Sequence, residues 1–437
     1  MQEHKRGVKA RWLRFSIVAI VWLVFVITFA RQSSGDATIW TRLFGVPAMA
    51  GPFADLSQIT AAVESARHGL DPYLTNPYDM AKRPYIYPRV WLYAFAALRI
   101  TPHRIVATGI ALAACFLLAV SWLILQQEDG LAALFIGLAT CSSATAFAIE
   151  RGNTDLFVFC LVVLASELVN RGGLWFLLAA SLLKVYPFFA LLAEAIMGWK
   201  TRLLVVALVL GAAGIVIQHH AVDLQDTSVP HGYGFKEIDL VMSRAPHYLR
   251  SSFTAHTQAF RVVWDSLLGL LCCSGLATGA IWGRRNFALN PSRTPEDSKT
   301  QGLAGSHAFV LCASIFAGTF LLSTNYDYRL IFLIPMAPFL AGQARARTGA
   351  QRLLRNLASA GLIMILIGVH RGVAGRIPWP GLAMSIKVAS HIDLWALLWT
   401  TCFFLGFIAV AEYHAKSKDP SSNRQKPLRV GLIKGSA

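Results

Sequence analysis

Long apolar runs separated by short polar segments dominate the chain. A helix that crosses the hydrocarbon core of a membrane needs about 20 apolar residues, and most of these runs approach that length. We therefore predict an all-α, polytopic membrane protein with about 12 transmembrane helices. They are expected near residues 12–30, 86–98, 104–125, 130–148, 155–169, 173–197, 203–218, 262–282, 306–323, 328–343, 356–370 and 392–411.

The composition supports this pattern. Of the 437 residues, 55% are hydrophobic and only 14% are charged, whereas a soluble protein carries about 25% charged residues. We expect one transmembrane domain over residues 1–411, followed by a polar cytoplasmic tail over 412–437 that is disordered. All seven cysteines lie in apolar runs, so neither a disulfide nor a zinc site is expected.

The orientation of the chain in the membrane explains the net charge of +17 better than a nucleic-acid partner does. Nucleic-acid binding requires basic residues on one soluble face, but here they are scattered among loops. Basic residues precede the first apolar run and recur at 284–285, at 345–355 and in the tail, which indicates cytoplasmic N- and C-termini. The first run has no cleavage site after it, so an uncleaved first helix is expected.

Three long segments are then predicted on the outer side, at 31–85, 219–261 and 371–391. Loops longer than about 12–15 residues are often functional. Residues 53–69 alternate apolar and polar positions at helical spacing, which predicts an amphipathic helix at the outer interface. Asp55 begins it, either as a carboxylate that stabilises the helix N-terminus or as a base at the lip of a membrane cavity.

Three tyrosines follow Asp55 in the same segment. Tyr73 belongs to an Asp-Pro-Tyr turn, and Tyr85 and Tyr87 belong to a Tyr-Ile-Tyr-Pro sequence before the second apolar run. Such residues are common in turns and in the aromatic belt of membrane proteins. The alternative is that their rings stack on a sugar or line a lipid groove.

Lys184 is a charged residue within the predicted helix 173–197. A lysine at the bilayer centre costs about 2.5–3.5 kcal/mol, so it needs a partner or a wet cavity. It either pairs with an intramembrane carboxylate, at Glu167, Glu194 or Asp265, or contacts a lipid phosphate. The preceding Glu150-to-Asp155 turn, with its Gly-Asn pair, falls on the inner side by charge counting.

Asn325 to Arg329 open the predicted helix 328–343 at the outer surface. An interfacial anchor with a local ion pair explains these residues. Alternatively, Arg329 binds phosphate and Asp327 shapes a sugar pocket. The loop 219–261 holds five histidines, but only one adjacent pair is closely spaced, so no metal is predicted; these are His219, His220, His231, His247 and His256.

Together these residues resemble the membrane glycosyltransferases of the GT-C class, and specifically glycosyltransferase family 87. The resemblance covers roughly residues 12–345 and is carried by the early outer Asp, Gly-x-x-Pro-Tyr and Tyr-x-Tyr-Pro, the Gly-Asn turn, Lys-x-x-Pro and the Asn/Tyr/Asp/Arg segment. It implies a catalytic aspartate at Asp55 and a functional lysine at Lys184. A mannosyltransferase member would carry a histidine in the late outer segment, but residues 323–329 of this chain contain none. The resemblance therefore does not identify the sugar or the acceptor.

The resemblance implies an enzyme that moves a sugar, mannose in that family, from a polyprenyl-phosphate donor to a glycan or glycolipid hydroxyl. The reaction would occur at the outer face of a bacterial cytoplasmic membrane, with inversion and without a cofactor. Asp55 is the expected general base, Lys184 and Arg329 the expected phosphate contacts, and Asp327 and the three tyrosines the expected sugar pocket. A twelve-helix secondary transporter and a non-catalytic, lipid-binding envelope protein are the alternatives.

Overall fold

The computed structural model describes residues 2–36, 38–49, 51–168, 172–197, 232–233, 257–289, 306–321, 325–345 and 352–418. In these ranges the chain is helical, apart from loops and one short antiparallel pairing in which Gly232 lies opposite Tyr326. The α-helices, as the structure defines them, are α1 (Gln2–Ser33), α2 (Ile39–Phe44), α3 (Ala54–Arg67), α4 (Arg89–Ala97), α5 (Ile105–Gln126), α6 (Gly130–Thr140), α7 (Ser143–Arg151), α8 (Asp155–Glu167), α9 (Gly173–Leu183), α10 (Phe188–Met197), α14 (Thr257–Leu289), α16 (Ser306–Leu321), α17 (Ala337–Ala344), α18 (Arg352–Val369) and α19 (Pro380–Lys418). The 3₁₀ segments are η1 (Pro102–Arg104), η2 (Asp327–Met336) and η4 (Arg371–Arg376), and the two strands are β1 (Gly232–Tyr233) and β2 (Asn325–Tyr326).

Several helices have the length and composition of membrane spans. Among the described residues, four helices qualify, or five if the bent pair α6 and α7, which meet at 49°, forms one span. The chain is therefore an all-helical protein with several long apolar helices, as a membrane protein requires. The four helical segments are Val8–Ser33, Pro102–Gln126, Arg352–Val369 and Gly381–Tyr413.

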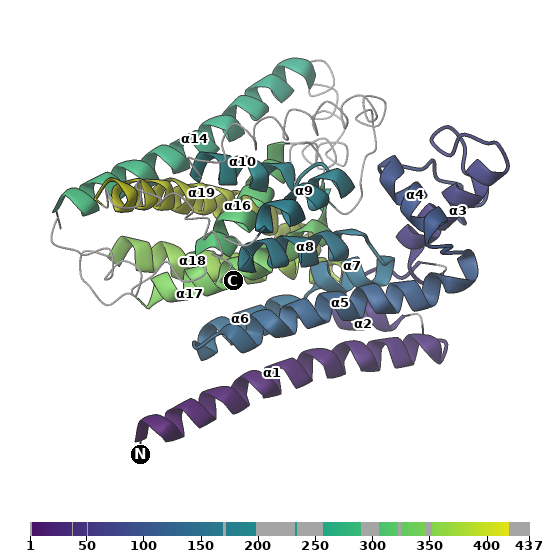
Figure 1. Cartoon of the computed structure of the whole chain (residues 1–437), viewed down its shortest axis with the longest axis horizontal. Helices are drawn as coiled ribbons and strands as arrows, with labels where there is room; N and C mark the ends of the chain where they lie inside the picture. The colour runs from purple at the N-terminus through teal and green to yellow at the C-terminus, as the bar shows by residue number, and fades with distance from the viewer. Residues whose placement is uncertain are drawn as a thin grey trace, which may run out of the picture.

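Helix α1 lies along one edge of the molecule beside α5 and α6, whereas α14 and α19 lie side by side away from that edge (Figure 1). The α14–α19 contact is close because glycines face it. A Cβ at Gly279 would come within 1.9 Å of the Phe403 carbonyl oxygen, and one at Gly406 within 2.2 Å of the Leu276 carbonyl oxygen. Small residues let helix backbones approach in this way inside a membrane.

Contacts between distant segments define one end of the helical bundle. Arg14, in the first half of α1, donates a hydrogen bond of 3.2 Å to the Leu125 carbonyl at the end of α5. Arg345, after α17, forms an ion pair of 2.5 Å with Asp129 in the α5–α6 turn. The start of α1, the α5–α6 turn and the end of α17 therefore share this end, which we call the basic end.

Helices α3 and α4 lie together at the other end of α1 and α5 (Figure 1). We call this the site end. Helix α4 has nine residues and is about 13 Å long at 1.5 Å per residue. The predicted transmembrane helix at 86–98 is therefore wrong, because a helix of this length cannot cross a membrane.

Losing that one crossing changes the side of the segments that follow. Helix α5 returns from the site end to the basic end, and the α6–α7 pair leads back to the site end, where the Phe53 amide donates a hydrogen bond of 3.1 Å to the Glu150 carbonyl. The Gly152-Asn153 turn thus lies at the same end of the molecule as residues 31–85. Charge counting placed these two segments on opposite sides because it assumed that 86–98 crosses the membrane, and the structure contradicts that separation.

The predicted helix 173–197 is two helices. Helix α9 ends at Leu183, Lys184 is extended at φ −149° and ψ 145°, and α10 begins at Phe188. Pro187 has no backbone N–H and its ring disfavours a continuous helix. Lys184 therefore lies at a break between helices rather than within one. Similarly, the predicted helix 328–343 is η2, which contains Pro335, followed by α17.

The amphipathic helix expected at 53–69 is present as α3, but it is not a surface helix. Its polar residues Ser57 and Gln58 are buried together with its apolar face. Gln58 donates a hydrogen bond of 2.7 Å to the Pro84 carbonyl, so the following loop covers the helix. The segment 371–391, predicted as an outer loop, is also largely helical, in η4 and the start of α19.

Two predicted features fall mostly outside the described residues. The five histidines of segment 219–261 lie outside them, as does the predicted helix 203–218. Helix α19 continues to Lys418, so the first residues of the predicted polar tail are helical. The remainder of that tail, 419–437, lies outside the described part of the chain.

Candidate functional site

Asp55 lies in the first turn of α3 and is buried beneath two polar partners. The Asn153 side-chain amide donates a hydrogen bond of 2.5 Å to Asp55 Oδ2, and the Arg83 guanidinium lies 3.7 Å from Asp55 Oδ1. The side chain of Asp55 keeps 12% of its surface exposed. Its carboxylate is thus held on both oxygens and retains a limited opening.

Arg83 is itself fixed by Asp79. The guanidinium donates hydrogen bonds of 3.0 Å to both Asp79 oxygens and one of 2.9 Å to the Ala54 carbonyl. Burial disfavours the charged form of Asp79, but hydrogen bonds from Arg83 outweigh it and hold the pKa of Asp79 below its ordinary value. The Asp79 and Arg83 pair therefore positions a cation beside Asp55.

The Gly-Asn turn brings Asn153 to Asp55. Gly152 ends α7 in the left-handed conformation at φ +60°, which favours glycine. A Cβ at Gly152 would lie 2.9 Å from the side chains of Phe53 and Leu56, so only a glycine allows α3 to approach the turn this closely. The Met49 amide also donates a hydrogen bond of 2.9 Å to Glu150 Oε1. These contacts hold Met49 and residues 53–56 against the end of α7.

Lys184 and Arg329 converge on one carboxylate, that of Asp155. Lys184 Nζ lies 3.1 Å from Asp155 Oδ1, and Arg329 Nε lies 3.6 Å from Asp155 Oδ2. The partner of Lys184 is therefore Asp155, at the start of α8, rather than one of the three carboxylates named from the sequence. Of those, Glu194 instead contacts His307.

The prediction that Lys184 pairs with Glu167, Glu194 or Asp265 failed for a geometric reason. The break after α9 places Lys184 at the level of the α7–α8 turn, where the Trp91 indole N–H also donates a hydrogen bond of 3.1 Å to the Leu183 carbonyl. A lysine at the end of a helix reaches the first residue of its neighbour, Asp155. A midspan lysine would have reached a midspan acid.

Aromatic rings lie against the charged groups of Lys184 and Arg329. The Lys184 ammonium lies 4.4 Å from the centroid of the Tyr87 ring, and the Arg329 guanidinium carbon lies 4.9 Å from that of Tyr186, both within the range of cation–π attraction. Burial and the nearby Asp55 carboxylate raise the pKa of Tyr87 well above its ordinary value, so the phenol stays neutral. Tyr87 therefore lies among the charges of the site.

Tyr73 and Tyr85 pack next to Tyr87 and hold the loop that carries it. The Tyr73 hydroxyl donates a hydrogen bond of 2.8 Å to the Tyr87 carbonyl, and the Tyr73 and Tyr85 rings meet edge to face at 5.1 Å. Tyr85 has no exposed surface and donates its hydroxyl to the Pro88 carbonyl at 3.1 Å. Its burial raises its pKa. This geometry favours packing of the loop, rather than stacking on a sugar, as the role of Tyr85.

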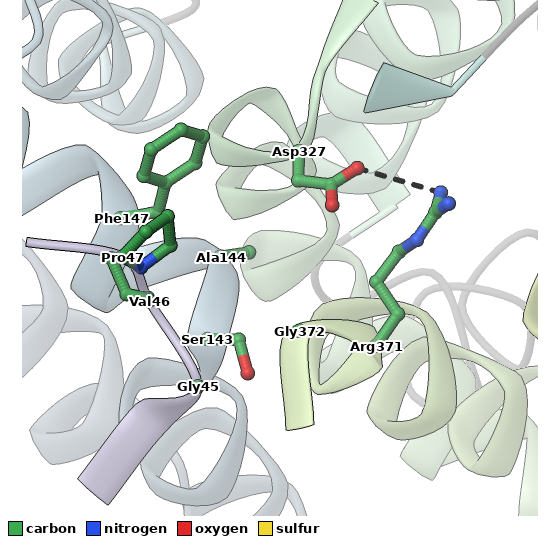
Figure 2. Close-up of a pocket in the computed structure, with 9 residues that line it drawn as sticks. All are labelled: Gly45, Val46, Pro47, Ser143, Ala144, Phe147, Asp327, Arg371 and Gly372. Carbon is green, nitrogen blue, oxygen red and sulfur yellow. Dashed lines mark ion pairs between the residues drawn. The ribbon is translucent and has the colours of Figure 1, made fainter. Parts of the chain in front are cut away.

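Asp327, predicted beside Arg329, occupies a separate place. It forms an ion pair of 3.4 Å with Arg371, and both side chains line a hollow between η2, η4 and α7 (Figure 2). In a 3₁₀ helix successive side chains point about 120° apart, so Asp327 and Arg329 face different neighbours although they are two residues apart. Tyr328 lies between them and packs on Phe147 at 5.5 Å.

The charged side chains near Asp55 form two groups. Around Asp155 two cations face one carboxylate, whereas around Arg83 two carboxylates face one cation. Asp55 is close enough to act electrostatically on Lys184 and Tyr87. The site therefore offers a hydrogen-bond acceptor, Asp55, at one side and the two cations Lys184 and Arg329 at the other.

Sequence reasoning missed half of the residues that make this arrangement. Arg83 and Asn153 hold Asp55, Asp155 holds the two cations, and Arg371 holds Asp327. A buried charge requires a partner, so Asp155 at the start of an apolar helix was the available signal. Within the described ranges, no group of three or more His, Cys, Asp and Glu residues is arranged to hold a metal ion.

Comparison with protein-family models, with curated proteins and with solved structures finds no match to this chain.

Proposed function

We propose that the protein is a membrane glycosyltransferase of GT-C type, with Asp55 as the general base. The observation that carries the proposal is the Asp55 carboxylate, buried at the head of α3, held by Asn153 and Arg83, and partly open. A base must be positioned and must reach an acceptor hydroxyl, and this geometry supports both requirements. The chemistry then follows from the residues around it.

The reaction is a direct displacement. Asp55 takes the proton of the acceptor hydroxyl while its oxygen forms a bond to the anomeric carbon of the donor sugar. The bond from that carbon to the phosphate oxygen breaks, and the phosphate leaves with the electron pair. Attack from the opposite face inverts the anomeric configuration, and the general base contributes about 10²–10⁴-fold to the rate.

Lys184 and Arg329 are the groups proposed to stabilise the departing phosphate. Both lie against the Asp155 carboxylate, which holds the two cations together at that side of the site. Both are largely buried, with 9% and 20% of their side chains exposed, and charge interactions are stronger in such a medium than in water. A phosphate that gains charge in the transition state would be stabilised there.

The membrane setting selects the donor class. The site end lies at one end of the long apolar helices, and nucleotide sugars remain in the cytoplasm. We propose that the site end faces outward from a bacterial cytoplasmic membrane and takes a polyprenyl-phosphate sugar, mannose in the resembling family, and a glycan or glycolipid acceptor. The basic end would then be cytoplasmic, in agreement with its Arg14 and Arg345.

Reconstitution tests the proposal. Purified protein in liposomes would receive a polyprenyl-phosphate donor with a radiolabelled hexose, together with short hexose acceptors, and products would be resolved by mass spectrometry. We expect labelled product whose new linkage has the inverted anomeric configuration. Donor consumption without a new glycosidic bond, or no donor consumption with any tested hexose, would contradict a transferase.

A secondary transporter is the second candidate, because the break at 184–187 places one charged residue, Lys184, between two helix ends. Broken helices of this kind form substrate sites in transporters. The same liposomes distinguish the two functions. A transporter would accumulate a labelled solute inside them without forming any covalent product.

A further inference from the structure

The phenol of Tyr326 is half-buried among the charged groups of the site, and the proposed displacement does not use it. Four charged side chains act on it electrostatically, and the Asp55 carboxylate comes first among them. The other three are the guanidinium groups of Arg329, Arg83 and Arg151. Tyr326 therefore lies near the proposed base and also near one of the proposed phosphate contacts.

The backbone of Tyr326 is fixed on both sides. Tyr326 pairs with Gly232 in the antiparallel contact of β1 and β2, and it caps the N-terminus of η2. Directly opposite residues in such a pair project to the same face of the ladder, and glycine has no side chain. The pairing therefore holds Tyr326 in place without covering its ring by a cross-strand neighbour.

The ring of Tyr326 is fixed by stacking. It lies on the Tyr328 ring with the centroids 5.0 Å apart and the planes inclined by 13°. Tyr328 in turn packs on Phe147 at 5.5 Å, so the stack is anchored on α7. Side chains three residues apart in a 3₁₀ turn lie on one side, which places Tyr326 on the side of Arg329.

The hydroxyl group is the part of Tyr326 that remains for a ligand. Among the residues that the structure describes, this hydroxyl has no hydrogen-bond partner, whereas the hydroxyls of Tyr73 and Tyr85 donate to backbone carbonyls. Burial and the Asp55 carboxylate raise the pKa of Tyr326, so its hydroxyl keeps the proton. It can therefore donate one hydrogen bond and accept another.

The transferred sugar has to lie between the two ends of the site. In the proposed displacement its anomeric carbon receives the acceptor oxygen beside Asp55 and releases the phosphate beside Lys184 and Arg329. Tyr326 lies near both ends, because Asp55 and Arg329 both act on it. The proposed mechanism therefore brings the hydroxyl groups of the sugar next to the Tyr326 phenol.

We propose that the Tyr326 hydroxyl binds a ring hydroxyl of the transferred sugar and thereby determines which hexose the site accepts. This inference rests on the proposed transferase function. A site group that hydrogen-bonds a substrate hydroxyl discriminates against a sugar that lacks it, because the group is then left unpaired. Tyr328 holds the phenol in place for this contact, and Lys184 and Arg329 remain the phosphate contacts.

Donor binding tests the contact without requiring transfer. Wild type, Tyr326→Phe and Lys184→Met would be titrated by thermophoresis with short-chain isoprenyl phosphates that carry mannose, glucose, galactose or no sugar. Tyr326→Phe keeps the ring stack and removes only the hydroxyl. It should weaken binding of the hexose donor that wild type prefers about 10-fold and leave binding of the sugar-free phosphate unchanged. Lys184→Met should weaken binding of both.

Analogues of the preferred donor that each lack one ring hydroxyl identify the contact. For one analogue, wild type and Tyr326→Phe should bind equally, because the hydroxyl that Tyr326 recognises is absent. The other analogues should keep the 10-fold difference. Tyr93→Phe is the matched control, since Tyr93 is an exposed tyrosine on α4 at the same end of the molecule. It should match wild type with every ligand.

Three results would overturn the contact: wild type that binds no hexose donor more tightly than the sugar-free phosphate, an equal loss of both in Tyr326→Phe, or a difference that no deoxygenation removes. Sugar-dependent binding that requires the Tyr326 hydroxyl, in a protein that transfers no sugar, would support the contact and contradict the transferase. Transfer by Tyr326→Phe with wild-type kcat and donor KM would support the transferase and contradict the contact.

Discussion

The side-chain amide of Asn153 donates a hydrogen bond of 2.5 Å to the carboxylate of Asp55, although 98 residues separate them in the chain. This bond joins the first turn of α3 to the turn between α7 and α8. It brings the proposed base into contact with the segment that also supplies Asp155. Much of the proposed mechanism depends on this contact.

Asn153 is predicted to position the base. Asn153→Ala removes the hydrogen bond and should lower kcat about 10-fold with little change in donor or acceptor KM. The reason is that the Asp55 carboxylate remains present but is no longer held in its orientation. Asn153→Asp should be worse, since two adjacent carboxylates repel each other. Steady-state kinetics in liposomes measure both. A change confined to KM would contradict a positioning role.

Lys184 is predicted to bind the donor phosphate. Lys184→Met should raise donor KM about 10-fold or more, the loss expected for a hydrogen bond to a charged group, while acceptor KM stays constant. Lys9→Met is the control, because Lys9 is an exposed lysine on α1 in the part opposite the site. Loss of Lys184→Met from the membrane, with normal activity in the remaining molecules, would make Lys184 structural.

The Asp79 and Arg83 pair is predicted to make stability depend on pH. The pKa of Asp79 lies below its ordinary value of 3.8 in the folded protein, so its contribution is full above that pH and is lost as the pH falls through the lowered pKa. Asp79→Asn should therefore lower the melting temperature at pH 7. The difference from wild type should shrink below about pH 4.

Thermal unfolding in detergent at pH 7 and at pH 3 measures this effect. Asp71→Asn is the control, because Asp71 is exposed and its side chain accepts a hydrogen bond of 3.0 Å from the nearby Tyr73 amide. A melting-temperature difference for Asp79→Asn that is equal at both pH values would show that the charge of Asp79 does not matter.

The sequence predicted the class of fold because apolar runs of membrane length are a strong signal, and it named Asp55, Lys184 and Arg329, which the structure brings into one neighbourhood. It could not give their partners. Each partner depends on where a helix stops: α4 is too short to cross, and α9 breaks before Pro187. Hydropathy alone does not distinguish a short helix or a broken one from a crossing helix.

Topology provides an independent prediction. Single cysteines would replace Thr75 and Gly381, at the site end, in a protein whose native cysteines have been removed. Both should react with an impermeant thiol reagent in cells whose outer envelope has been permeabilised. A cysteine at Glu128, beside Asp129 at the basic end, should not. Reaction at Glu128 alone would reverse the orientation. Reaction at both Thr75 and Glu128 would contradict a crossing by α5.

The central claim is that Asp55 removes the proton of the acceptor. Asp55→Asn keeps the size of the side chain and can keep a contact to Asn153, but it removes the basicity. Protein level and melting temperature should therefore change little, and Asp71→Asn, in the exposed turn, should transfer sugar at a nearly normal rate.

The decisive measurement is single-turnover transfer of a labelled hexose from a polyprenyl-phosphate donor to an acceptor in liposomes, at matched amounts of wild type, Asp55→Asn and Asp71→Asn. The account predicts that Asp55→Asn binds the donor normally but transfers its sugar about 10²-fold more slowly or worse. Near-normal transfer by Asp55→Asn, or a larger defect in Asp71→Asn, would remove Asp55 from the mechanism.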